Sequence, residues 1–223
     1  MKKRSISLVL AFLLALTLLP ATAFAGDVVA SGTCGGDEDG GVVYWALTST
    51  GVLDIYGSGD MDNYLPNDPP PWYASRETVI QVVVESGVTG IGCYAFADCL
   101  NLERVSLPDS VQRVGEWTDG YVFRNCPSLR SIDVDGSNPV FYSDNGVLLG
   151  ENCLYCYTAA KTDPYYCLPE DTYGNIFAGA FFGASHLERV YIPDISSIEF
   201  PSSRAAPLWR PSISAEARRP RAG

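Results

Sequence analysis

The sequence predicts an α/β solenoid, in which parallel strands alternate with short helical turns. The main observation is an internal repetition: residues 102–108 (LERVSLP) recur as residues 187–193 (LERVYIP), with a looser copy (LRSIDV) at 129–134. In each copy the apolar positions suit a strand that lines a core, and proline ends two of them because it cannot donate to a strand ladder. A unit this short cannot bury its apolar edge alone, so neighbouring units are expected to stack around one continuous core.

The first 25 residues read as a secretory signal peptide. Three basic residues follow Met1, an apolar run spans 6–19, and Ala23-Phe24-Ala25 offers a small-x-small cleavage site. A retained anchor is the alternative, but this run is short for a bilayer span of about 20 residues. We therefore expect residues 1–25 to be removed, leaving no integral membrane span and a protein that is secreted or displayed at the cell surface.

The expected mature region is strongly acidic. Residues 26–203 contain 25 Asp and Glu against 7 Lys and Arg, a formal charge of −18, whereas the whole chain carries −11. Such a surface repels nucleic acid and anionic lipid, and its commonest meaning is solubility. The charge excludes nucleic acid as an expected partner but does not identify one.

Residues 26–87 are predicted to form an N-terminal capping module. Two apolar runs within 42–56, separated by a turn that contains Gly51, predict a β-hairpin at the open edge of the solenoid. The following segment is rich in turn residues and ends in three prolines before Trp72. We expect an extended loop there, with Trp72 as a plug of the core.

Residues 88–200 are assigned to the solenoid itself. The repeat starting at Val88 has its counterpart at Val111, a spacing of 23, whereas Phe96 and Phe123 are 27 apart. The Ala-Phe-x-x-Cys segment beginning at Ala95 is long enough only for a helical turn. One strand and one such turn in each unit is the leucine-rich-repeat scheme.

The change of spacing indicates a four-residue insertion between Gly115 and Phe123. It places Trp117, Asp119 and Tyr121 on a loop, and insertions in solenoids map to loops on one face, often the binding face. We take these three residues as candidate partner contacts. The alternative is a neutral insertion whose aromatic rings fold back onto the body.

Two further segments depart from the simple period. Residues about 138–161 predict a hairpin inserted between turns of the solenoid, with Asn145-Gly146 as its turn signal. In the last segment, 201–223, 18 of 23 residues are Pro, Ser, Arg or Ala, which predicts a disordered tail. The repeat that begins at Ile195 does not complete, which we interpret as truncation; a shifted reading frame or an end covered by another subunit are the alternatives.

The seven cysteines do not require a disulfide framework. Cys99 and Cys126 hold the same repeat position, where the third repeat has Ala184, so the position is expected to need a small buried side chain. A Cys99–Cys126 bond is the geometrically allowed alternative. Cys153-x-x-Cys156 lacks the second ligand pair of a zinc site.

With these residues in hand, the chain resembles the BspA-type leucine-rich-repeat proteins of bacterial cell surfaces. The resemblance rests on residues 91–99 (IGCYAFADC) followed by 102–108, and on an N-terminal module that includes 31–35 (SGTCG), 57–61 (GSGDM) and 82–89 (VVVESGVT). It implies a solenoid whose face contacts a host matrix or bacterial surface protein, including in adhesion. The family defines no universal binding residues to carry over.

No catalytic, cofactor-binding or metal-ligating residue is predicted, and we do not expect an enzyme. The single histidine, His186, holds the repeat position of Asn101 and Ser128, a solvated loop position, and no strained nucleophile turn surrounds it. A carbohydrate-binding or carbohydrate-active protein stays open, since a carboxylate pair needs only separation and environment. A truncated, non-functional fragment is the third interpretation.

Overall fold

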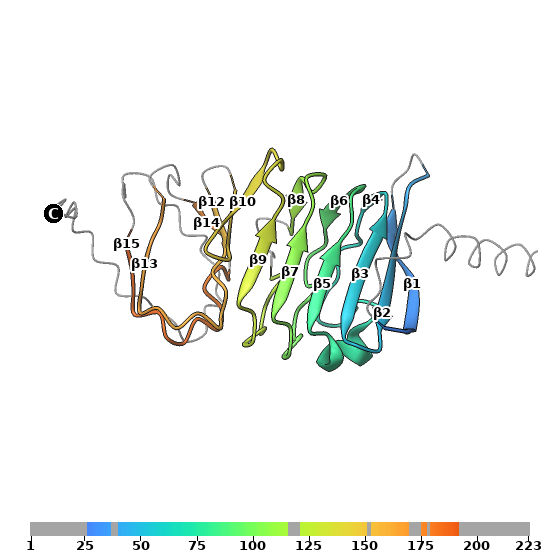
Figure 1. The fold of residues 1–223 in the computed structure, drawn as a ribbon, viewed down its shortest axis with the longest axis horizontal. Helices are drawn as coiled ribbons and strands as arrows, with labels where there is room; N and C mark the ends of the chain where they lie inside the picture. The colour runs from blue at the N-terminus through green and yellow to red at the C-terminus, as the bar shows by residue number, and fades with distance from the viewer. Residues whose placement is uncertain are drawn as a thin grey trace, which may run out of the picture.

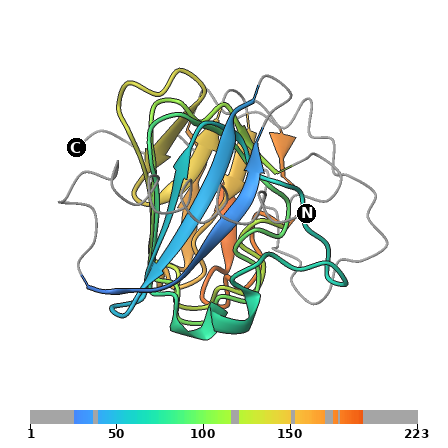
Figure 2. The same cartoon turned by 90° about the vertical axis from the view of Figure 1, so that its right-hand side faces the viewer.

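The computed structural model describes residues 26–36, 40–115, 121–150, 153–169, 175–177 and 179–191, which form a β-solenoid (Figure 1). Figure 2 looks along it from the end where β1 lies, and successive turns of the chain overlap in this view. The expected signal peptide, most of the inserted loop and the expected tail lie outside the described residues. No helix in the described part is long and apolar enough to cross a membrane.

The main sheet has six strands, in the order β1-β2-β3-β5-β7-β9. They are β1 (Val28–Gly36), β2 (Val42–Thr48), β3 (Val52–Gly57), β5 (Gln81–Val84), β7 (Arg104–Leu107) and β9 (Ser131–Val134). The first three pair antiparallel, and from β3 onward the pairing is parallel and in even register. The antiparallel part corresponds to the expected N-terminal hairpin, to which the structure adds β1, a strand that sequence reasoning did not anticipate.

A second, three-stranded parallel sheet contains β4 (Gly59–Asp60), β6 (Val88–Ile91) and β8 (Arg113–Val114). The chain passes from a strand of the main sheet to one of the second sheet, then through turns, and back. β7 ends directly before Pro108, because proline has no N–H to donate to the strand ladder.

The expected helical turns are mostly not helices. In the described residues the one helix is a 3-10 helix at Tyr73–Thr78, before the first repeat. The Ala-Phe-x-x-Cys segments form single hydrogen-bonded turns instead, such as Ala97 N donating to Tyr94 O at 3.1 Å. Tyr94 and Asp98 have φ of 54° and 61°, and left-handed residues of this kind interrupt a right-handed helix.

A stack of aromatic rings runs through the core. Trp45 packs edge-on against Trp72 at 5.7 Å, Trp72 against Phe96 at 6.1 Å, and Phe96 against Phe123 at 5.8 Å. Trp72 is the expected plug: it is 1% exposed and donates from Nε1 to Ala95 O at 3.0 Å. Equivalent positions of successive turns lie over one another, so a repeated phenylalanine becomes a ladder of contacts.

One repeat position needs a left-handed backbone. Asp98, Asn125 and Gly183 hold it in three repeats, with φ of 61°, 55° and 82°. These are the residue types that tolerate this conformation best.

The next position is buried. It is held by Cys99, Cys126 and Ala184, at most 2% exposed, which confirms the prediction of a small buried side chain. Cys99 and Cys126 are both free thiols.

Beyond β9 the strands have two to four residues and form one four-stranded and one two-stranded sheet. They are β10 (Phe141–Asp144), β11 (Val147–Gly150), β12 (Cys153–Cys156), β13 (Tyr165–Cys167), β14 (Asn175–Ile176) and β15 (Arg189–Tyr191). β10 and β11 pair antiparallel around the predicted Asn-Gly turn, β12 adds to them, and β12–β14 and β13–β15 pair in parallel. A second hydrophobic cluster fills this part.

Candidate interaction surface

The outward face of the main sheet presents side chains in straight rows. Val82, Val105 and Ile132 point inward from β5, β7 and β9 and are 0% exposed. Residues alternate across a strand, so the next residue of each strand points outward, and the parallel register aligns Val83, Ser106 and Asp133 in one row. The row before it holds Gln81, Arg104 and Ser131. The face over β5, β7 and β9 is therefore an array of mostly polar and charged groups, with Val83 as the apolar member.

Asp54 lies on this face but is only 2% exposed. It pairs with Ala46 of β2 and Val83 of β5, and neither carboxylate oxygen has a hydrogen-bond partner. Burial, and secondarily the charge of Glu85, raise the pKa of Asp54 from 3.8 to about 7. Removal from water disfavours the charged form of a carboxyl group, which accounts for the direction of this shift.

Two tyrosines stack beside this carboxyl. Tyr44 and Tyr56 are directly opposite each other on β2 and β3, with ring centroids 5.5 Å apart and an interplanar angle of 21°. Both rings are half-buried on the same face as Asp54. Burial first, then Tyr44 and Asp54, raise the pKa of Tyr56, so its hydroxyl stays protonated and able to donate.

Of the three candidate contacts on the inserted loop, the described residues include Tyr121. Its half-buried ring packs against Tyr94, the residue at the same position one repeat earlier, with centroids 5.6 Å apart. At the corresponding place one turn later, a Cβ on Gly179 would come within 2.7 Å of the Tyr121 ring. Trp117 and Asp119 lie outside the described residues. The contact role of all three stays a prediction.

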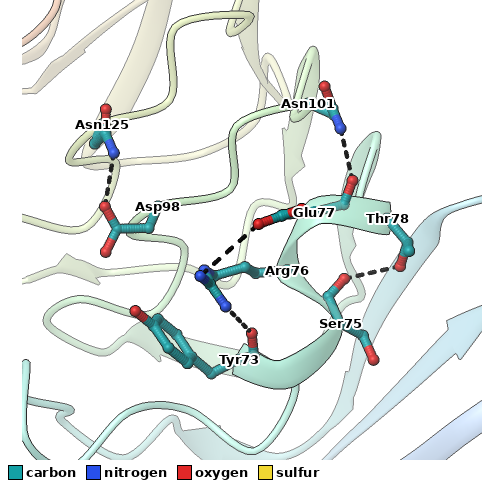
Figure 3. A network of polar contacts seen from close by, with 8 residues as sticks. All are labelled: Tyr73, Ser75, Arg76, Glu77, Thr78, Asp98, Asn101 and Asn125. Carbon is teal, nitrogen blue, oxygen red and sulfur yellow. Dashed lines mark hydrogen bonds and ion pairs between the residues drawn. The ribbon is translucent and has the colours of Figure 1, made fainter.

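The turns on the side of the 3-10 helix are linked by polar side chains (Figure 3). Asn101 Nδ2 donates to Glu77 O at 2.7 Å, and Asn125 Nδ2 donates to Asp98 Oδ1 at 2.8 Å. Arg76 lies over the Tyr73 ring, 4.0 Å from its centroid, and donates to its carbonyl. These groups hold consecutive turns in register.

A cavity of about 290 Å³ lies on the second sheet. Its lining comprises Asp60, Met61, Asn63, Gly90, Ile91, Arg113 and Gly115. Asp60 forms an ion pair with Arg113 across Gly90, and accepts a hydrogen bond from Thr89 Oγ1 at 2.6 Å. The ion pair occupies the charged groups of this cavity, which leaves no acid–base pair poised for chemistry in its lining.

The predicted solvated position of His186 is confirmed. His186 is exposed, and its Nδ1 lies 3.4 Å from Ser185 Oγ. The described part of the chain holds no group of three or more residues that could bind a metal ion.

Parallel strands, short turns and a repeated aromatic core define a leucine-rich-repeat solenoid. The sequence model of the BspA type leucine rich repeat region matches residues 72–202 with six copies. The chain belongs to this family. No curated protein matches the chain.

Several solved structures are similar to the chain. A leucine-rich repeat protein from Eubacterium ventriosum is 23% identical, with a TM-score of 0.33, over 73% of this chain and 60% of that one. The pneumococcal vaccine antigen PcpA is 15% identical, with a TM-score of 0.39, over 72% and 64%. A leucine rich cell surface protein from Faecalibacterium prausnitzii is 13% identical, with a TM-score of 0.29, over 77% and 73%.

Sequence reasoning missed Asp54 and its two tyrosine neighbours. The strand pattern held a signal, because in Leu53, Asp54, Ile55 and Tyr56 the apolar residues alternate with polar ones. Alternation places Asp54 and Tyr56 on the outward face. The burial of Asp54 there depends on which side chains lie beside it on neighbouring strands, and this alternation does not contain that information.

Proposed function

We propose that this chain is a non-enzymatic leucine-rich-repeat protein, secreted or displayed at the cell surface, which binds another protein. The observation that carries the proposal is the outward face of the main sheet. Its parallel strands present aligned, partly exposed side chains such as Arg104, Ser106 and Asp133. Stacked repeats use such extended faces to contact partners. A host matrix or bacterial surface protein is the expected partner class, with adhesion as the expected outcome.

In this proposal the antiparallel strands β1 to β3 cap the solenoid. Trp45 of β2 lies at one end of the aromatic stack and is 6% exposed. These strands thereby cover the apolar N-terminal end of the stack, and solenoids require covered ends for solubility. The β10–β11 hairpin is in turn proposed as an insertion between turns.

The proposal is tested with the full chain on immobilised fibronectin and fibrinogen and on a glycan array, with thermal unfolding as the control for folding. Two charge-reversal variants test whether binding depends on the sheet face or on the rest of the surface. Asp133→Lys changes the face, whereas Asp109→Lys makes the same charge change at an exposed turn after β7.

The proposal is supported if the chain binds a matrix protein saturably, Asp133→Lys weakens this binding at least fivefold, and Asp109→Lys leaves it within twofold. Equal effects of both variants contradict the sheet face as the binding surface. Binding to glycans alone favours a carbohydrate-binding protein. A sample without a cooperative transition favours the non-functional fragment.

A further inference from the structure

Among the described residues, Asp54 has no hydrogen-bond partner for its carboxyl group. Its neighbours along β3, Leu53 and Ile55, point into the core, so the carboxyl group points to the outward face, where both oxygens are buried and unpaired. A buried charge without a partner opposes folding, and any apolar residue of similar size would avoid that cost. Groups of this kind are concentrated at functional sites.

The surroundings of Asp54 are acidic and aromatic. Glu85 follows β5 and is held beside β3 by its amide, which donates to Ile55 O at 2.8 Å. The stacked rings of Tyr44 and Tyr56 occupy the same face. On β7 the outward cation is Arg104, which is aligned with Gln81 of β5 and not with the row of Asp54. In the described residues the oxygens of Asp54 therefore lack a balancing cation.

Carboxylates beside tyrosine rings are the groups that bind an ammonium or guanidinium ion. The carboxylate supplies charge-assisted hydrogen bonds, and the ring faces attract the cation through their quadrupoles. The formal charge of −18 over residues 26–203 also attracts basic partners over longer distances. A cation that is brought to this face replaces the missing partner of Asp54.

We propose that the face formed by Asp54, Glu85, Tyr44 and Tyr56 receives one positively charged side chain, lysine or arginine, from a protein partner. This rests on the proposed function and names the chemistry of the partner. Tyr44, Tyr56 and Glu85 are half-buried, so their side chains reach solvent and can change rotamer to admit the cation.

Binding is coupled to the ionisation of Asp54. The free carboxyl has a pKa of about 7, and a bound cation favours its charged form. The affinity for a lysine side chain therefore rises as the pH increases from 6 to 8. A cation held only by exposed acidic groups, which are ionised throughout this range, shows no such rise.

The test uses the full chain and two probes, Nα-acetyl-lysine methylamide and its uncharged analogue Nα-acetyl-norleucine methylamide. Carbon-13 NMR follows the Asp54 carboxyl during titration with each probe at pH 6 and pH 8 in 150 mM salt. Asp54→Asn removes the charge at the site, and Asp109→Asn removes one at an exposed turn. Thermal unfolding verifies that both variants fold.

We expect the lysine probe to bind at least tenfold more tightly than the norleucine probe at pH 8 and to lower the pKa of Asp54. Asp54→Asn should remove this preference, and Asp109→Asn should leave it within twofold. Equal binding of the two probes, or equal weakening by the two variants, overturns the inference.

The probe assay needs no protein partner, so the two proposals fail separately. Protein binding that is unchanged by Asp54→Asn overturns the cation site and leaves the proposed function standing. Specific binding of the lysine probe without binding to any protein supports the cation site and contradicts the proposed function.

Discussion

The turns up to β9 and the part from β10 onward are built from related sequences but pair their strands differently. In the main sheet of the first region parallel strands pair over three or four residues, and one row of aromatic rings joins consecutive turns. The second sheet of this region pairs over two residues. In the second, β12 and β14 pair at two residues and β13 and β15 at three. The longer parallel ladders are those of the main sheet, where the repeats succeed each other without interruption.

The second region also has its own core. Residues such as Phe177, Tyr157 and Leu187 form a cluster of their own. Tyr155 lies where it meets the first cluster, packing against Phe141 of the first at 5.0 Å and Phe177 of the second at 4.9 Å. A small cluster buries less apolar surface for each ordered residue, so its local stability is expected to be lower. The comparison predicts two units of unequal stability within one solenoid.

The largest expected effect comes from the aromatic core. Phe96 is 0% exposed and stacked between Trp72 and Phe123. Phe96→Ala should therefore lower the free energy of unfolding by about 3–5 kcal/mol. Phe177→Ala in the second region should speed hydrogen exchange of β12 and leave β5 and β7 protected. Urea unfolding and amide exchange measure this. Equal loss of protection in both regions after either change would show a single cooperative unit.

A smaller effect comes from Asp54 of β3, in the first region. Its pKa of about 7 in the folded state exceeds the usual 3.8, so between pH 4 and 7 the unfolded chain loses this proton while the folded chain keeps it. Stability should fall as the pH rises through this window, by a few kcal/mol at about 1.4 kcal/mol per pKa unit. Asp54→Asn should flatten the curve of Tm against pH. An unchanged curve would contradict the assignment.

The left-handed repeat position provides a third test. Gly183→Ala should destabilise the second region by about 1–2 kcal/mol, because an L-residue is strained at its φ of 82°. Gly136→Ala is the control, since nothing lies within 4 Å of a Cβ there and its φ is not in the left-handed range. Hydrogen exchange should show the loss in β15 and not in β7. A similar cost for both variants would indicate that backbone strain is not the cause.

The smallest effect is expected at the surface. Glu103 and Arg130 form an exposed ion pair between consecutive turns, with a Nε–Oε2 distance of 3.9 Å. Solvent screens such pairs, so Glu103→Gln should change the free energy of unfolding by less than about 0.5 kcal/mol. Denaturant titration at low and high salt measures this. A loss above 1 kcal/mol would mean that side-chain pairs contribute to stacking as much as the core does.

Repeated residues made the first region readable from the sequence. The recurring motif of residues 102–108 predicted a continuous core, and Cys99 and Cys126 predicted a small buried position, because the same residue types return at equivalent places. The prediction of helical turns was wrong, because the short segments between strands contain residues with a left-handed backbone, such as Tyr94. The helix propensity of a tyrosine does not indicate this conformation. β1 was missed because its Gly, Ser and Thr residues give a weak strand pattern.

The sequence by itself determined the family, the parallel stacking and the position of the core, because these follow from local apolar spacing that recurs along the chain. The tertiary structure alone decided which outward side chains meet across strands. Asp54, Tyr44 and Glu85 come from three different strands or their ends. Their mutual burial and charge depend on register and packing between distant segments, and local pattern does not encode either.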